Sequence, residues 1–172
     1  MREILTDWLI EVHLKFKLLP ETLYLTVNLI DRFLSTTQIY RNKLQLVGVT
    51  AMLIASKYEE IYPPIVSDFV YITDNAYTRE EILEMEERML MALQFSIHFT
   101  SPYRFLERFL FLKRASETEK NFALFMLEGS LIQYQMLDYK PSVIAASALY
   151  LSSKLCFSKE PWSNRMASIT TL

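Results

Sequence analysis

Side chains that could do chemistry are few and widely spaced along this chain. His13 and His98 are the only histidines, and neither has a second candidate ligand at the spacing that zinc sites show. Cys156 is the only cysteine, and it follows an apolar run without a nearby histidine, which favours a packed position in the core over a reactive thiolate. These residue types predict no metal site and no cofactor.

Adjacent acidic residues are the remaining candidates for acid–base catalysis. Such pairs occur at 59–60, 80–81 and 86–87. Adjacent side chains on a helix point about 100° apart, so the two carboxylates of a pair do not converge on one reacting atom. We interpret the pairs mainly as solvated helix surfaces and predict that the chain is not an enzyme. Its surfaces are expected to carry the function.

A segment of the first half recurs in the second half at a fixed offset. Residues 51–57 (AMLIASK) resemble residues 148–154 (ALYLSSK), 97 positions later. The same ungapped offset aligns the apolar residues of two earlier segments, 8–12 and 25–34, with apolar residues of the second half. A single offset that holds over several segments indicates one helical unit used twice. The two predicted repeats span residues 1–97 and 98–172.

The composition favours an all-α fold. Of 172 residues, 51% are hydrophobic and only two are glycine, and the apolar runs are rich in Leu, Met and Ala. The net charge is −2 and the basic residues are scattered, so the chain lacks the positive field that nucleic-acid binding requires. The longest uncharged apolar runs have 13 residues, whereas a bilayer crossing needs about 20. We expect neither a nucleic-acid partner nor a membrane segment.

The first repeat is predicted to contain five helices. Pro20 suits the first turn of the second helix, and Thr78 with Glu81 forms a capping box for the fifth. The third helix has Thr50 as its only polar side chain between positions 46 and 55, so we expect it to be buried on all sides, with Gly48 allowing a neighbour to approach closely. The five predicted ranges are 1–17, 20–35, 44–58, 66–72 and 79–93.

The second repeat is predicted to begin with Ser101 as an N-cap and Pro102 as the first helical residue. The chain ends at Leu172, just past the counterpart of the fourth helix, so the second repeat lacks a counterpart of the fifth. We therefore expect an incomplete second repeat, with an apolar groove exposed where that helix would pack and with lower stability. Its predicted helices span residues 103–114, 117–136 and 141–155.

Two segments of the first repeat carry recognisable motifs: MREILTDWL at residues 1–9 and ASKYEEIYPP at residues 55–64. The first is similar to the opening helix of the cyclin box, usually MRAILxDWL, and together the segments resemble A/B-type mitotic cyclins. The B-type features are the more numerous, although Glu11 is typical of the A type. The resemblance implies an all-α fold of two five-helix cyclin-box repeats. Further matching segments lie at residues 21–24, 31–34, 44–48, 69–75 and 141–146.

This resemblance implies a regulatory subunit that binds and activates a cyclin-dependent protein kinase and controls G2/M progression. In the family, a lysine and a glutamate hold a mobile helix of the kinase, so that a catalytic Lys–Glu ion pair forms within the kinase. The matching positions are Lys57 and Glu86. The apolar positions matched around them are Ile54, Tyr58, Leu90, Phe95 and Ile97.

If the resemblance is set aside, Lys57 and Glu86 can each be explained by their positions in a helix. Lys57 ends a helix, where a cation is favourable near the negative end of the dipole. Glu86 would be an ordinary exposed helix residue. The resemblance favours the binding interpretation because an ammonium can donate to free carbonyls, and a carboxylate can accept from free N–H groups, at the end of a partner helix.

The resemblance also implies a shallow groove that docks RxL motifs of substrates or inhibitors. Periodicity alone would place Ile4, Leu5 and Trp8 in the core, but this helix carries more apolar residues than one buried face needs. Glu11 matches the acidic residue that meets the arginine of the motif. The apolar and polar positions matched to the groove are Met1, Ile4, Leu5, Trp8, Leu44 and Gln45.

Two other functions are compatible with the same fold. A nucleic-acid-binding factor of the TFIIB type would need a positive face and a steep salt dependence, which the net charge of −2 disfavours. A cyclin-fold adaptor would bind partners without activating a kinase. By resemblance, we expect the protein in the nucleus and the cytoplasm.

Overall fold

The first repeat contains five α-helices whose ends lie within one residue of the predicted ends. The computed structural model describes residues 1–156, 162 and 167, and within these residues it contains helices and no strand, which confirms the all-α prediction. The helices are α1 (Arg2–Phe16), α2 (Pro20–Thr36), α3 (Leu44–Glu59), α4 (Val66–Ile72) and α5 (Arg79–Ala92), with a 3-10 turn, η1 (Arg41–Lys43), before α3.

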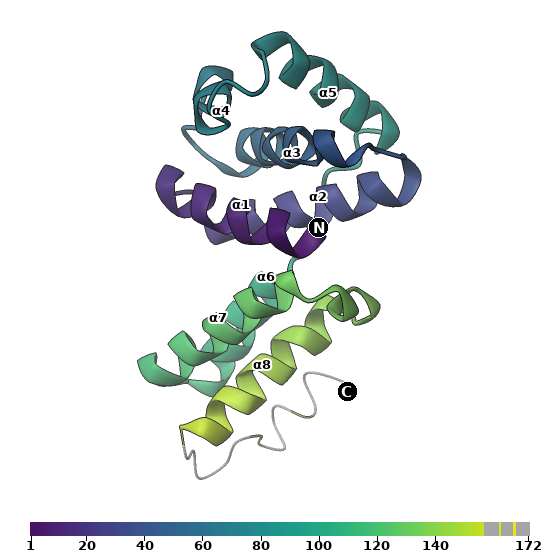
Figure 1. The fold of residues 1–172 in the computed structure, drawn as a ribbon. Helices are drawn as coiled ribbons and strands as arrows, with labels where there is room; N and C mark the ends of the chain where they lie inside the picture. The colour runs from purple at the N-terminus through teal and green to yellow at the C-terminus, as the bar shows by residue number, and fades with distance from the viewer. Residues whose placement is uncertain (157–161, 163–166, 168–172) are drawn as a thin grey trace. The chain divides into compact units, whose positions relative to one another are not determined.

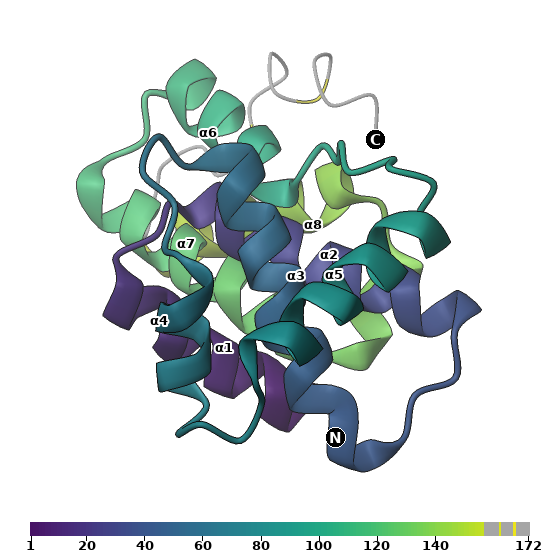
Figure 2. The same ribbon diagram turned by 90° about the horizontal axis from the view of Figure 1, so that it is seen from above.

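Helix α3 is the centre of the first compact unit, which spans Met1–Phe99. Figure 1 shows α1 and α2 on one side of α3 and α4 and α5 on the other, and α3 contacts all four of these helices (Figures 1 and 2). Every residue of α3 from Leu46 to Ser56 is buried. The prediction that this helix is surrounded by its neighbours is therefore confirmed.

Gly48 allows α1 to pack closely against α3. A Cβ atom at this position would lie 2.9 Å from Leu5 Cδ1 and 3.4 Å from Leu9 Cδ1. The first distance is shorter than a carbon–carbon contact allows, so the leucine or the helix would have to move. The close approach expected at this glycine is confirmed.

Two ion pairs join segments that are distant in sequence. Arg2 donates from Nε and Nη2 to the two carboxylate oxygens of Asp31, at 2.6 and 2.9 Å, and so links α1 to α2. Lys43 of η1 donates to Glu81 of α5 at 2.8 Å. This hydrogen bond lowers the pKa of Glu81 and raises the pKa of Lys43. Both pairs fix the positions of helix ends in the first unit.

The second compact unit begins at Thr100, and α8 packs on both α6 and α7 within it. Ser101 caps α6 by accepting from the Arg104 N–H, as predicted. The helix predicted at 117–136 is shorter, because the backbone leaves helical geometry at Gln133 and continues as a 3-10 turn that buries no residue. Tertiary packing stabilises most helices in proteins, and residues 134–138 bury no side chain that could hold them in the α-helix. The elements are α6 (Pro102–Lys113), α7 (Glu117–Ile132), η2 (Tyr134–Asp138) and α8 (Pro141–Leu155).

An open apolar groove of about 520 Å³ lies between α7, η2 and α8, with Met126, Val143 and Leu151 in its lining. At the offset of 97 residues, Val143 and Leu151 correspond to Leu46 and Ile54 of the first unit. Leu46 and Ile54 are both buried. An apolar groove was expected in this repeat. The predicted lack of a last helix concerns positions after 156, nearly all of which lie outside the described residues.

Candidate protein-binding site

Lys57 and Glu86, 29 residues apart in the chain, form an ion pair at the surface of the first unit. Lys57 Nζ lies 2.7 Å from one carboxylate oxygen of Glu86 and 2.9 Å from the other. The pair forms because α5 packs along α3 and brings Glu86 beside the last turn of α3. The Lys57 side chain is 47% exposed and that of Glu86 13%. An ammonium has three N–H donors, so one remains for a partner.

The apolar residues predicted around this ion pair differ in how much surface they offer. Tyr58 and Phe95 are exposed. Leu90 and Ile97 are half-buried and pack against the core. Ile54 is only 3% exposed and belongs to the core of the first unit. A partner at this surface would therefore meet mainly Tyr58 and Phe95.

A turn with unusual backbone geometry presents Phe95 after α5. Gln94 and Phe95 have φ values of 52° and 54°, in the left-handed region that non-glycine residues seldom adopt. The Phe95 N–H donates to the Leu90 carbonyl at 2.9 Å, which closes the end of α5. Arg32 of α2 donates to the Ser96 carbonyl at 2.7 Å. These hydrogen bonds hold a strained turn in place, as expected where the surroundings determine the conformation.

The surface predicted along α1 includes three well-exposed residues. Met1 and Ile4 are exposed, Ile4 by 67%. Glu11 is also exposed, and it lies seven residues after Ile4, which places both side chains on the same face of the helix. This face therefore offers an apolar group and a carboxylate about two turns apart.

The other residues predicted for this groove are more buried. Leu5 is 8% exposed and packs over Gly48, so it contributes little surface. Trp8, Leu44 and Gln45 are half-buried. Trp8 and Leu44 also pack against the core. The burial of Leu5 and the packing of Trp8 agree with the prediction from periodicity that part of the apolar face of α1 points inward.

One member of each acidic pair has a specific partner, so the pairs are only partly solvated surfaces; the partners of Glu60 were not predicted. Glu60 accepts from the Leu19 N–H at 2.7 Å and from Thr22 Oγ1 at 2.5 Å, and so joins the end of α3 to the start of α2. Glu81 caps α5, and Glu86 binds Lys57. Adjacent side chains point to different sides, so one of each pair faces a neighbouring segment.

Of the residues weighed for metal or nucleophilic chemistry, His13 is buried, Cys156 is partly buried and His98 is exposed. His13 is buried, and this burial lowers the pKa of its ring, while the Glu60 carboxylate raises it by a smaller amount. Cys156 is partly buried at the end of α8, whereas a core position was expected. Among the described residues, no group of three or more His, Cys, Asp or Glu side chains could hold a metal ion. No described helix is both long enough and apolar enough to cross a bilayer.

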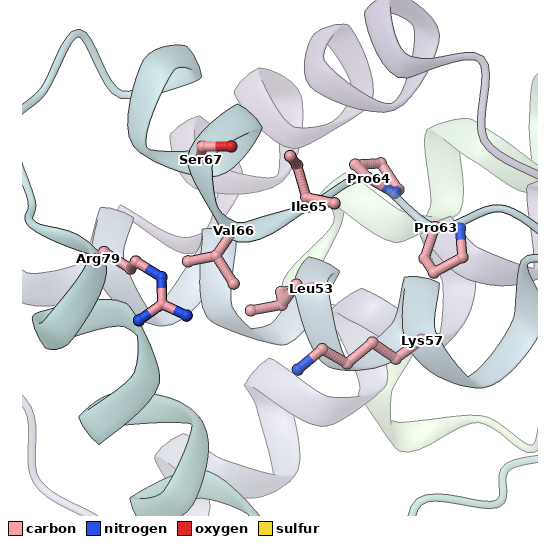
Figure 3. Close-up of a pocket in the computed structure, with 8 residues that line it drawn as sticks. All are labelled: Leu53, Lys57, Pro63, Pro64, Ile65, Val66, Ser67 and Arg79. Carbon is pink, nitrogen blue, oxygen red and sulfur yellow. The ribbon is translucent and has the colours of Figure 1, made fainter.

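Sequence reasoning did not find a cavity of about 430 Å³ beside Lys57 (Figure 3). Its lining combines Lys57 of α3 with residues of the loop before α4, of α4 itself and of the first turn of α5, including Arg79. No local pattern places Arg79 near Lys57, because only the packing of three separate segments does so.

Both units of the chain match known protein domains. The cyclin N-terminal domain matches residues 1–98, and the cyclin C-terminal domain matches residues 100–172. Cyclin-B2-1 from Oryza sativa subsp. japonica is 56% identical over 153 residues, which cover 87% of this chain and 36% of that protein. G2/mitotic-specific cyclin-1 from Medicago sativa subsp. varia is 51% identical over 163 residues, which cover 95% of this chain and 38% of that protein.

A solved structure has the same fold. The viral cyclin from herpesvirus saimiri superposes with a TM-score of 0.89 at 24% identity, covering 99% of this chain and 77% of that one. The chain itself spans less than two fifths of the length of the two plant relatives. Both cyclin domains match in order along the sequence, and B2-type and G2/mitotic cyclins are more than half identical to it, so the chain belongs to the cyclin family.

Proposed function

We propose that this chain is a regulatory subunit that binds and activates a cyclin-dependent protein kinase at G2/M, in the nucleus and the cytoplasm. The observation that carries the proposal is the ion pair between Lys57 and Glu86, which presents a donor and an acceptor together at the surface. Family membership and the names of the mitotic relatives support it.

The two charged groups suit the end of a helix in the kinase. The free N–H of Lys57 can donate to an unpaired carbonyl there, and the lone pairs of Glu86 can accept from an unpaired N–H. Tyr58 and Phe95 supply apolar surface for the same helix. Binding that favours one position of this helix shifts the kinase towards the state in which its own catalytic Lys–Glu pair forms. The chemistry would belong to the kinase, and this chain would select the conformation.

A reconstituted kinase assay tests this function. The chain is mixed with a purified cyclin-dependent kinase, and phosphate transfer from ATP to a histone substrate is measured. Phosphorylation that rises with the amount of chain added is the expected result. Binding without activation would favour a cyclin-fold adaptor, and salt-sensitive binding to DNA in place of the kinase would favour a TFIIB-like factor.

We further propose that α1 carries the docking groove for RxL peptides. Ile4 offers an exposed apolar contact, and Glu11 offers a carboxylate for the arginine of the motif. Trp8 and Leu44 would form the partly buried floor between α1 and α3. Such a small contact area suits affinity on the order of micromolar.

Replacing Ile4→Ser is expected to weaken RxL peptide binding by roughly tenfold, because it removes most of one apolar contact. The stability of the chain should change little, since Ile4 is 67% exposed. Leu14→Ser is the matched control, because Leu14 lies on the same helix, is exposed to the same extent and is not part of the proposed groove. Fluorescence polarisation with a labelled peptide measures both variants. Equal affinity of the two variants would contradict the groove.

A further inference from the structure

The turn after α5 has a tight backbone made from residue types that do not favour it. The Ser96 N–H donates to the Leu93 carbonyl at 3.0 Å, and the two residues between them, Gln94 and Phe95, both have positive φ values. A turn with two such central residues corresponds to type I′, which favours asparagine and glycine. Glutamine and phenylalanine carry a Cβ atom that makes this geometry unfavourable. The turn therefore depends on hydrogen bonds from its surroundings.

Arg32 provides such a hydrogen bond from another helix. Its Nη2 atom donates to the Ser96 carbonyl at 2.7 Å, although the two residues are 64 positions apart in the sequence. Ser96 is the last residue of the turn, so this bond fixes the end of the turn relative to α2. The bond from the Phe95 N–H to the Leu90 carbonyl fixes the turn relative to α5. A hydrogen bond from a guanidinium is stronger than one between neutral groups.

The second unit indicates that the repeated helical unit does not require an arginine at this position. At the offset of 97 residues, Arg32 corresponds to Gly129 of α7. A Cβ atom at Gly129 would have no neighbour within 4 Å, so α7 packs without a side chain there. The role of Arg32 is therefore specific to the first unit, where its guanidinium holds the Ser96 carbonyl.

The turn carries Phe95, whose side chain is 61% exposed. If the φ value of Phe95 changed to the common negative range, its Cα–Cβ bond would point in a different direction. A side chain that is already held in its binding conformation loses less freedom when a partner binds.

We infer that Arg32 is a positioning residue for kinase binding, which holds this turn so that Phe95 meets the kinase together with the ion pair of α3 and α5. Arg32 acts through the turn and not through contact with the kinase. The inference rests on the proposed function, in which Phe95 supplies apolar surface for a helix of the kinase.

A double-mutant cycle tests whether Arg32 acts through Phe95. Arg32→Met removes the donor and keeps an unbranched side chain, and it is expected to lower the affinity for the kinase roughly tenfold, because the turn no longer fixes Phe95. Phe95→Ala is expected to lower the affinity at least as much. In the double variant, Arg32→Met should cause little further loss, since the side chain that it positions is absent. Calorimetric titration of the kinase with the unmodified chain and the three variants measures the affinities.

Two further variants distinguish positioning from a general loss of structure. Arg41→Met is the matched control, because Arg41 is an exposed arginine of η1 that lies outside the turn and the proposed kinase-binding residues. Gln94→Gly removes the Cβ atom that opposes a positive φ value, so it should restore most of the affinity that Arg32→Met loses. Amide hydrogen exchange of Phe95 and Ser96 should be faster in Arg32→Met and slower again when Gln94→Gly is added.

The possible results separate this inference from the proposed function. If the unmodified chain binds the kinase and Arg32→Met binds as tightly as Arg41→Met, Arg32 does not position the site and the function stands. The same conclusion follows if the loss is equal with and without Phe95→Ala, or if Gln94→Gly does not reduce it, because Arg32 would then act independently of the turn. If the unmodified chain does not bind the kinase, the proposed function is wrong, and the inference falls with it.

Discussion

Replacing Lys57→Ala and Glu86→Ala together is expected to abolish detectable kinase binding, with a loss of affinity of about 100-fold or more. Truncating charged, hydrogen-bonded partners in an interface costs several kcal/mol, about 2–5 in comparable cases. Each residue holds the other in place at 2.7–2.9 Å, so even a single substitution leaves the remaining group misplaced or uncompensated. The measurements are calorimetric affinity and histone phosphorylation by the reconstituted kinase.

The double substitution should leave the chain folded. Lys57 is half exposed, and ion pairs of this kind contribute about 0–1 kcal/mol to stability. Arg104→Ala with Glu107→Ala is a matched control, since these residues form an exposed ion pair of 2.9 Å in the second unit. We expect normal kinase activation from the control. Full binding and activation by the Lys57 and Glu86 variant would refute the proposed site.

Lys113→Met is expected to destabilise the second unit by roughly 3–5 kcal/mol. Lys113 forms an ion pair with Glu119, and both side chains are about nine-tenths buried. Lys113 also donates to Ser153 Oγ at 2.5 Å, which joins the end of α6 to α8. Removal of the cation leaves a buried carboxylate without its counter-charge, and breaking a buried pair from one side has a cost of this size.

Urea denaturation followed by circular dichroism measures the change in the free energy of unfolding. Lys120→Met is the matched control, because Lys120 pairs with Glu117 at 3.2 Å on the exposed side of α7, and its loss should cost less than about 1 kcal/mol. Adding Glu119→Gln to Lys113→Met should recover part of the stability by removing the uncompensated charge. If Lys113→Met and Lys120→Met have the same effect, the buried ion pair does not stabilise this unit.

The helices of this protein follow from local signals in its sequence. Pro20 and Pro102 begin helices, and Thr78 and Ser101 cap them, because these effects act over one helical turn. The buried character of α3 was readable because nearly all of its side chains are apolar. The end of α7 at Ile132 depends on packing, so the local sequence pattern was not sufficient to predict it.

The candidate site was only partly predictable. Lys57 and Glu86 were identified through resemblance to a family, but their mutual contact required two helices to pack side by side. The exposure of individual apolar residues was also decided by packing: Ile4 is open to solvent and its neighbour Leu5 is buried, although both are apolar residues of the same helix. Nothing in the sequence pointed to Arg79, which reaches the same cavity as Lys57 from the start of another helix.

The sequence alone determined the helices, their repetition at a fixed offset and the family, because caps, prolines and apolar periodicity depend on residues within one or two turns. The tertiary structure alone decided which charges meet and which apolar side chains remain open. Those properties depend on the angles and distances between helices that are distant in the sequence. Close contacts, such as the packing of α1 on α3 at Gly48, determine those angles and distances.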